Sequence, residues 1–172
     1  MTQPYIIVIS GNSCTGKSTL IKELQKKLIG SYHIGYDRVK WWLGGYDRDR
    51  DRKIVKDILS GFIETLLEKG ISCITDSAFD ESRYTHIEEL ADRHTYKILS
   101  IHLECSLDIR LERFRDRVVR WKKEGIRMMV TDESVFLESA EKGYYFPENS
   151  LVFDTSEQKS EDIAQKIIQK LK

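Results

Sequence analysis

Apolar residues along the chain gather in five short runs, separated by longer stretches in which apolar positions recur every three or four residues. Short apolar runs are typical of strands buried inside a sheet, whereas the longer spacing is typical of helices with one apolar face. The runs predict strands over residues 5–10, 32–36, 71–75, 98–103 and 151–153. The periodic stretches predict five helices. One spans residues 17–29, a second ends at about residue 69, a third lies near residues 82–93, a fourth runs from residue 107 onward and the last includes residues 163–171.

Strands that alternate with helices at this spacing favour an α/β fold, a parallel five-stranded sheet flanked by helices in three layers. The 172 residues include only two prolines and no low-complexity linker, so we expect a single domain over residues 1–172. Residues 105–145 are expected to form a small helical lid on that domain.

Residues 11–19 read GNSCTGKST and fit the pattern G-x-x-x-x-G-K-[ST]. They lie between the first predicted strand and the first predicted helix, which is the context of a P-loop NTPase fold. Glycines let such a loop curl so that its backbone N–H groups surround an anion, and the helix start adds further N–H groups. The candidate phosphate-binding residues are Gly11, Asn12, Ser13, Cys14, Thr15, Gly16, Lys17, Ser18 and Thr19. Lys17 would reach the β- and γ-phosphates and Ser18 would ligate Mg²⁺.

Composition narrows the class of protein. Lysine plus arginine equals aspartate plus glutamate, 28 against 28, so the overall charge gives no argument for nucleic acid or an anionic membrane as partner. No apolar run approaches the length of a membrane span, and the start of the chain does not resemble a secretory signal. The cysteines Cys14, Cys73 and Cys105 have no metal-like spacing and fit a reducing compartment, so we expect a cytoplasmic protein.

The sequence also lacks the marks of two other nucleotide-binding classes. It has no Asn-Lys-x-Asp element of guanine-specific switches. Asp76 is followed by Ser77 rather than by the second acid of large motor ATPases, and the chain is too short for their separate lid domain. These absences favour a small phosphotransferase.

With these motifs in this order, the chain resembles small P-loop kinases, especially chloramphenicol phosphotransferase, the 5′-kinase domain of polynucleotide kinase and zeta-type toxins. The resemblance implies ATP and Mg²⁺. It makes Asp37, at the end of the second predicted strand, the general base that accepts the proton of an acceptor hydroxyl. The alternative is that Asp37 caps a helix starting near Arg38. Lys40 stands where the polynucleotide kinase pattern has arginine, a departure that argues against a nucleic acid 5′-end or a nucleotide as the acceptor.

The same resemblance assigns roles to residues further along the chain. Asp76 would hold Mg²⁺ through water, although a loop aspartate could equally cap the next segment. Arg113 and Arg117 lie one helical turn apart and match lid arginines that neutralise the transferred phosphoryl group; Arg110 is a weaker candidate. Asp154 and Thr155 would border the adenine ring, or form an ordinary polar turn.

The acceptor site is expected after the second strand. Trp41, Trp42 and Tyr46, together with Lys40, could stack on a flat acceptor, or the aromatic rings could simply pack a helix against the sheet. The run from Asp47 to Lys53 is most simply a solvated, self-neutralising loop or helix start. Tyr144, Tyr145 and Phe146 could line the same cleft or anchor a loop. No role follows for His33, His86, His94 or His102.

Two functions follow from this pattern. The first is an ATP-dependent phosphotransferase that moves the γ-phosphate of ATP to a hydroxyl of a small-molecule, nucleoside, nucleotide or sugar-like acceptor. The alternative is a nucleotide-binding regulatory ATPase module with no dedicated acceptor. The partners would then be a nucleotide and a small molecule, with no membrane, no strong nucleic-acid signal, and a monomer or homodimer as the assembly.

Overall fold

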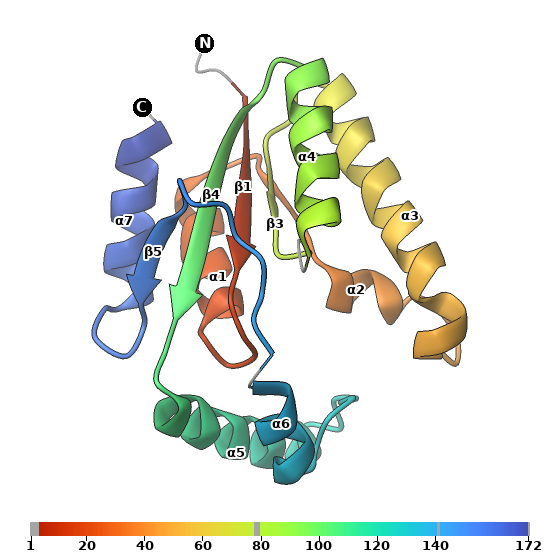
Figure 1. Cartoon of the computed structure of the whole chain (residues 1–172), viewed down its shortest axis with the longest axis vertical. Helices are drawn as coiled ribbons and strands as arrows, with labels where there is room; N and C mark the ends of the chain where they lie inside the picture. Colours follow the sequence, from red (N-terminus) through yellow and green to blue (C-terminus); the bar gives the residue numbers. More distant parts are fainter. Residues whose placement is uncertain (1–3, 78–79, 141, 172) are drawn as a thin grey trace.

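The structure is a computed structural model, and it describes residues 4–77, 80–140 and 142–171 (Figure 1). The strands are β1 (Tyr5–Ser10), β2 (Tyr32–Ile34), β3 (Cys73–Thr75), β4 (Lys97–Glu104) and β5 (Leu151–Asp154). The helices are α1 (Lys17–Lys27), α2 (Tyr36–Lys40), α3 (Arg48–Glu68), α4 (Glu81–Arg93), α5 (Leu107–Lys123), α6 (Glu133–Ala140) and α7 (Ser160–Leu171).

The five strands form one parallel sheet, as predicted, and their order within it is β2-β3-β1-β4-β5. The strand at its centre is β1, which pairs with β3 on one side and β4 on the other. Since successive side chains of a strand point to opposite faces, Ile6 and Val8 enter one core and Ile7 and Ile9 enter another. A central strand needs apolar residues at every position for this reason, which explains the uninterrupted run.

Helices cover both faces of the sheet and complete the three layers (Figure 1). On one face α1 and α7 pack through Leu20, Leu24 and Ile163, which are fully buried. On the other face α3 and α4 pack through residues such as Leu59 and Ile87. Within the described part of the chain, no helix has the length and apolar character that a membrane crossing requires.

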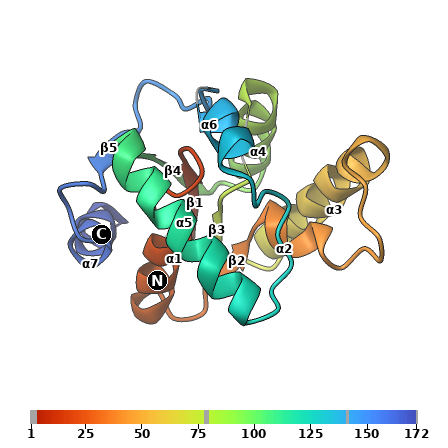
Figure 2. The same ribbon diagram turned by 90° about the horizontal axis from the view of Figure 1, so that it is seen from below.

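The carboxyl ends of the parallel strands meet at one edge of the sheet, and α5 runs across this edge with α6 beside it (Figure 2). Phe114 of α5 stacks on Phe136 of α6 with ring centroids 4.3 Å apart, and both rings are buried. This contact joins the two helices into one unit above the loop between β1 and α1.

Three details differ from the sequence prediction. The short helices α2 and α6 were not among the helices predicted from periodicity, because five and eight residues are too few to display a clear helical period. A helix near Arg38 was offered only as an alternative, and α6 lies within the expected helical lid. The second strand ends at Ile34 rather than at residue 36, since α2 begins at Tyr36. In α3 the fully buried stripe is Val55, Leu59, Ile63 and Leu67, whereas the neighbouring stripe that reveals the period in the sequence leaves Ile54 and Phe62 exposed.

Candidate active site

The loop between β1 and α1, residues 11–16, is curled and is called the P-loop below. Three of its residues have positive φ, namely Gly11 at 132°, Cys14 at 65° and Gly16 at 91°. At Gly11 the requirement for glycine is also steric, since an added Cβ would lie 2.5 Å from the backbone oxygen of Leu103. No side chain caps the start of α1. Its first backbone N–H groups are therefore available to bind an anion.

Lys17 lies at the bottom of this loop. Its ammonium donates to the backbone oxygens of Gly11 at 2.7 Å and of Asn12 at 2.8 Å. Burial lowers the pKa of Lys17, while the negative charges of Asp76 and Asp37 act in the opposite direction. An ammonium with two backbone acceptors retains a third N–H for a ligand.

Asp37 lies in the first turn of α2, across the cavity from the P-loop. Its side chain is 84% exposed and forms an ion pair with Lys40, whose own side chain is only 10% exposed. The alternative interpretation of Asp37 as a helix cap is wrong, because Gly35 occupies the cap position of α2. The carboxylate is therefore held by one buried cation and otherwise faces open space.

Asp76 follows β3 and also lines this cavity. Its Oδ1 lies 3.3 Å from Nε2 of His33, a residue of β2 to which the sequence assigned no role. Since β2 and β3 are neighbours in the sheet, a prediction of strand order would have been needed to bring His33 and Asp76 together. Gly35 makes their approach possible, because a Cβ there would lie 2.6 Å from Asp76 Oδ1 and 2.9 Å from His33 Nε2.

Three arginines of α5 reach the P-loop. Arg110 Nε donates to the backbone oxygen of Ser13 at 3.1 Å, and Arg117 lies 3.3 Å from the Ser13 hydroxyl. Arg113 donates to the backbone oxygens of Cys14 at 3.3 Å and of Thr155 at 2.8 Å. The predicted pair, Arg113 and Arg117, is thus accompanied by Arg110, which the sequence ranked below them although it is the most buried of the three.

Thr155 lies against the P-loop from the far side. Its hydroxyl donates to the backbone oxygen of Thr15 at 2.9 Å. The Asp154 carboxylate accepts from the backbone N–H of Ser156 at 2.7 Å, which is the hydrogen bond of a polar turn. The loop is the polar turn that the sequence offered as one description, and it lies next to the loop between β1 and α1. That it borders the adenine ring stays a prediction.

The candidate acceptor residues divide into two groups. Tyr46 is buried and its hydroxyl lies 2.8 Å from that of Tyr36, whereas Trp42 packs edge-on against Phe62 of α3. These two rings hold α2 to its surroundings. Trp41 makes an edge contact with Tyr46 and carries charged neighbours on its ring: the Lys40 ammonium lies 4.8 Å and the Arg127 guanidinium 4.6 Å from the ring centroid.

The aromatic residues at 144–146 are divided in the same way. Tyr144 lines the cavity and lies 5.8 Å from the Lys17 ammonium, measured to the ring centroid. Phe146 stacks on His102 at 3.7 Å, and the ring centroid of Tyr145 lies 5.8 Å from that of Tyr84. One of the three rings therefore faces the cavity, while the other two fix the segment against β4 and α4.

The cavity that these residues enclose has a volume of about 470 Å³. Its lining includes Gly11, Ser13 and Lys17 at the P-loop together with the acids Asp37 and Asp76. A second cavity of about 580 Å³ is lined mainly by Trp41, Trp42, Trp121, Ile126 and Arg127. Asp37 contributes to the walls of both, so its carboxylate lies where the two cavities adjoin.

Comparison with known protein families identifies the family of this chain. Residues 7–135 match the family model described as AAA domain, AAA_18. The chain belongs to this AAA domain family. Comparison with curated proteins gives no match.

Several solved structures have a similar fold and align with nearly the whole of this chain. A candidate kinase from Chloroflexus aurantiacus has a TM-score of 0.76 at 21% identity, over 97% of this chain and 98% of its own. The Mycobacterium tuberculosis APS kinase CysC, in complex with AMPPNP and APS, has a TM-score of 0.68 at 16% identity, over 98% of each chain. A gluconokinase from Sinorhizobium meliloti has a TM-score of 0.62 at 18% identity, over 99% of this chain and 93% of its own. At such identities the similarity establishes the fold.

The AAA domain also offers oxygen ligands suited to Mg²⁺. Among the described residues, no group of three or more histidine, cysteine, aspartate and glutamate side chains could hold a metal ion by itself. Mg²⁺ commonly takes one or two protein oxygens and completes its shell with phosphates and water. The exposed hydroxyl of Ser18, in the first turn of α1, and the carboxylate of Asp76 fit such a set.

Proposed function

We propose that this AAA domain is a P-loop kinase that transfers the γ-phosphoryl group of ATP to a hydroxyl of a small-molecule, nucleoside, nucleotide or sugar-like acceptor. The observation that carries the proposal is the shared cavity with the P-loop and Lys17 at one side and the exposed Asp37 carboxylate at the other. A nucleotide bound to the P-loop would present its terminal phosphate toward Asp37.

The reaction would be an in-line displacement. An acceptor hydroxyl near Asp37 attacks the γ-phosphorus through its oxygen, and the bond between that phosphorus and the β–γ bridging oxygen breaks, so ADP leaves. Asp37 orients the hydroxyl and accepts its proton. The buried Lys40 ammonium keeps the carboxylate in place before the acceptor binds.

Charge on the transferred group would be balanced from three directions. Lys17 lies at the P-loop, and Arg110, Arg113 and Arg117 extend from α5. Mg²⁺, held by Ser18 and through water by Asp76, would neutralise phosphate oxygens when bound. Residues 105–145, including α5 and α6, would act as the lid that excludes water from this space.

The test is an ADP-release assay with ATP, Mg²⁺ and a panel of hydroxyl compounds. We expect acceptor-dependent ADP release, and we expect Asp37→Asn to lower turnover by roughly 10²- to 10⁴-fold while ATP still binds. Asp57→Asn is the matched control, since Asp57 is an exposed acid of α3 that pairs with Lys53 outside the cavity. Equal loss in both variants, or none in either, would remove Asp37 from the mechanism.

The alternative function is a nucleotide-binding regulatory ATPase module with no dedicated acceptor. Slow hydrolysis of ATP that no compound in the panel accelerates, and that Asp37→Asn leaves unchanged, is the result expected from that module. The same assay therefore separates the two functions.

A further inference from the structure

The wall of the 470 Å³ cavity beyond Asp37 carries three positive charges that the proposed reaction does not use. Arg48 and Arg52 come from the first two turns of α3, and Lys142 follows α6. Within the described ranges, none of these side chains makes a hydrogen bond or an ion pair with another residue. Among the described residues of the same lining, Asp37 and Asp76 are the only acids, and Asp37 already pairs with Lys40.

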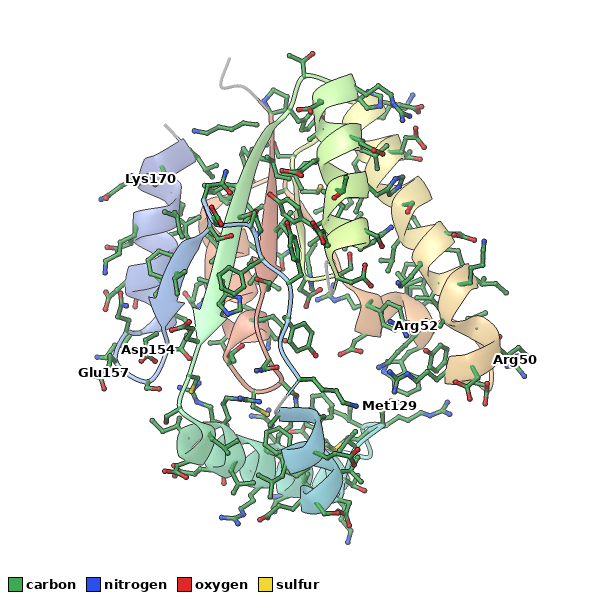
Figure 3. All side chains as sticks on the ribbon, in the orientation of Figure 1. Arg50, Arg52, Met129, Asp154, Glu157 and Lys170 are labelled. Carbon is green, nitrogen blue, oxygen red and sulfur yellow. The ribbon has the colours of Figure 1, made fainter. Side chains whose placement is uncertain are left out.

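Other cations of α3 do find partners. Arg50 donates to both carboxylate oxygens of Asp51 at 2.7 and 2.6 Å, and Lys53 pairs with Asp57 at 2.7 Å. Figure 3 shows Arg52 on the side of α3 toward α2 and Arg50 on the outer side. In the predicted self-neutralising run, Arg50 and Lys53 are therefore neutralised by acids of the same helix, whereas the arginines that line the cavity are not.

Helix stability does not explain this arrangement. Arg48 and Arg52 are four residues apart, so they repel each other on one helix face. They also lie at the amino end of α3, where the helix dipole disfavours cations. The free N–H groups there are already capped by the Asp47 carboxylate, which accepts from Asp49 and Arg50. The two guanidinium groups thus carry an electrostatic cost that an anion in the cavity would remove.

The two arginines are also separate from the groups that would hold ATP. The phosphate-binding cations Lys17, Arg110, Arg113 and Arg117 contact the P-loop backbone or Ser13, whereas Arg48 and Arg52 come from α3 on the Asp37 side. Their charges act on the hydroxyl of Tyr36, whose pKa is raised mainly by burial and is pulled back by both arginines. Arg48 acts in the same way on the pKa of Tyr144, which burial also raises. Arg48 therefore lies within electrostatic range of two tyrosines of the cavity wall.

We propose that the acceptor is an anionic hydroxyl compound, and that Arg48 and Arg52 bind its carboxylate, phosphate or sulfate group while its hydroxyl lies at Asp37. This inference rests on the proposed function and names the substrate class for the same cavity. Arginine suits the role because its planar fork binds two oxygens of such a group at once. Lys142, in the segment that follows α6, adds a third positive charge to the same lining.

The experiment compares pairs of acceptors in which an anionic group replaces a neutral one. Glycerate with glycerol and gluconate with the open-chain glucitol test a carboxylate, and adenosine 3′-phosphate with adenosine tests a phosphate. We expect kcat/KM for the anionic member of at least one pair to exceed that of its neutral partner at least tenfold. In the double variant Arg48→Gln/Arg52→Gln that preference should fall at least tenfold, through a higher KM for the anionic member.

Lys53→Gln is the matched control, because it removes one positive charge from the same helix outside the cavity, and it should keep the preference. Neutral members that react as well as anionic ones, or a preference that survives the double variant, would overturn the inference. So would an equal loss of ATP affinity in the double variant, because the arginines would then serve the nucleotide. Should the double variant not fold, Arg48→Gln and Arg52→Gln are measured singly, each with a smaller loss expected.

Binding separates this inference from the proposed function. Calorimetry with AMPPNP-saturated protein measures the affinity for adenosine 3′-phosphate, gluconate and glycerate without any transfer. Binding of one of them that is at least tenfold weaker in the double variant supports the anion site even if no compound is phosphorylated. Phosphorylation of neutral acceptors without such binding supports the kinase and refutes the anion site.

Discussion

Gly35→Ala tests whether the close approach of Asp76 and His33 to Gly35 fixes the position of the Asp76 carboxylate in the cavity. Gly35 has φ −122° and ψ 145°, which alanine adopts without strain, so the effect of the substitution is steric. The new Cβ would lie 2.6 Å from Asp76 Oδ1 and 2.9 Å from His33 Nε2. Non-bonded heavy atoms are comfortable at roughly 3.5 Å, so the Asp76 carboxylate must retreat by about 0.9 Å or the backbone must move.

This displacement is large enough to matter for both stability and chemistry. Overpacking of this kind costs about 1–3 kcal/mol, which lowers Tm by about 2–12 °C in a chain of this size. Functional groups must be held within about 0.5 Å of their working position, and a misplacement near 1 Å can reduce turnover about 100-fold. We therefore expect lower turnover together with a higher Mg²⁺ concentration for half-maximal activity.

The assay is a Mg²⁺ titration of acceptor-dependent ADP release, paired with thermal unfolding. Gly44→Ala is the control, because an added Cβ at Gly44 meets no atom within 4 Å. A Gly35→Ala protein with the same Mg²⁺ dependence and turnover as Gly44→Ala would refute the reasoning, since Asp76 could then move without consequence.

Three further outcomes follow from the packing. Gly11→Ala should abolish nucleotide binding and lower Tm, measured by calorimetry and thermal unfolding, because its Cβ would lie 2.5 Å from the Leu103 oxygen and φ is 132°; unchanged nucleotide affinity would contradict this. Phe114→Ala removes the buried ring stacked at 4.3 Å on Phe136, so the free energy of unfolding should fall by about 3–5 kcal/mol in denaturant titrations and amide exchange in α5 should accelerate; slow exchange would show that α5 is held elsewhere. Burial lowers the pKa of His102, so the unfolded chain binds a proton first as the pH falls below the ordinary value of about 6.5. Stability should therefore decline as the pH falls below about 6.5, and less steeply in His102→Gln, whereas parallel pH profiles would exclude His102 as the cause.

Elements and motifs with a local signature were predictable. The run from residue 5 to residue 9 and the glycines at 11 and 16 identify a buried strand followed by a phosphate-binding loop, and the fold has both. The alternation of strands and helices gave the parallel sheet, because each periodicity reflects which face of an element is buried. Asp37 and Asp76 were selected through the resemblance to small P-loop kinases, as acids that follow predicted strands.

The set of residues that meet around the cavity was harder to predict from the sequence. His33 reaches Asp76 only because β2 and β3 are neighbours. Arg110 could not be ranked within an arginine-rich helix until α5 was seen lying over the P-loop. Their neighbours in space are distant in sequence, so no window along the chain contains the pair.

The amino-acid sequence by itself determined the strand and helix periods, the P-loop and hence the class of fold, because backbone conformation and burial pattern depend on nearby residues. Tertiary structure alone decided which charges meet in one cavity. In the run from Asp47 to Lys53 every cation looks equivalent, and only the docking of α3 beside α2 turns Arg48 and Arg52 inward while Arg50 and Lys53 pair outside. The physical reason is that an electrostatic site is set by distances between elements, and those distances exist only after packing.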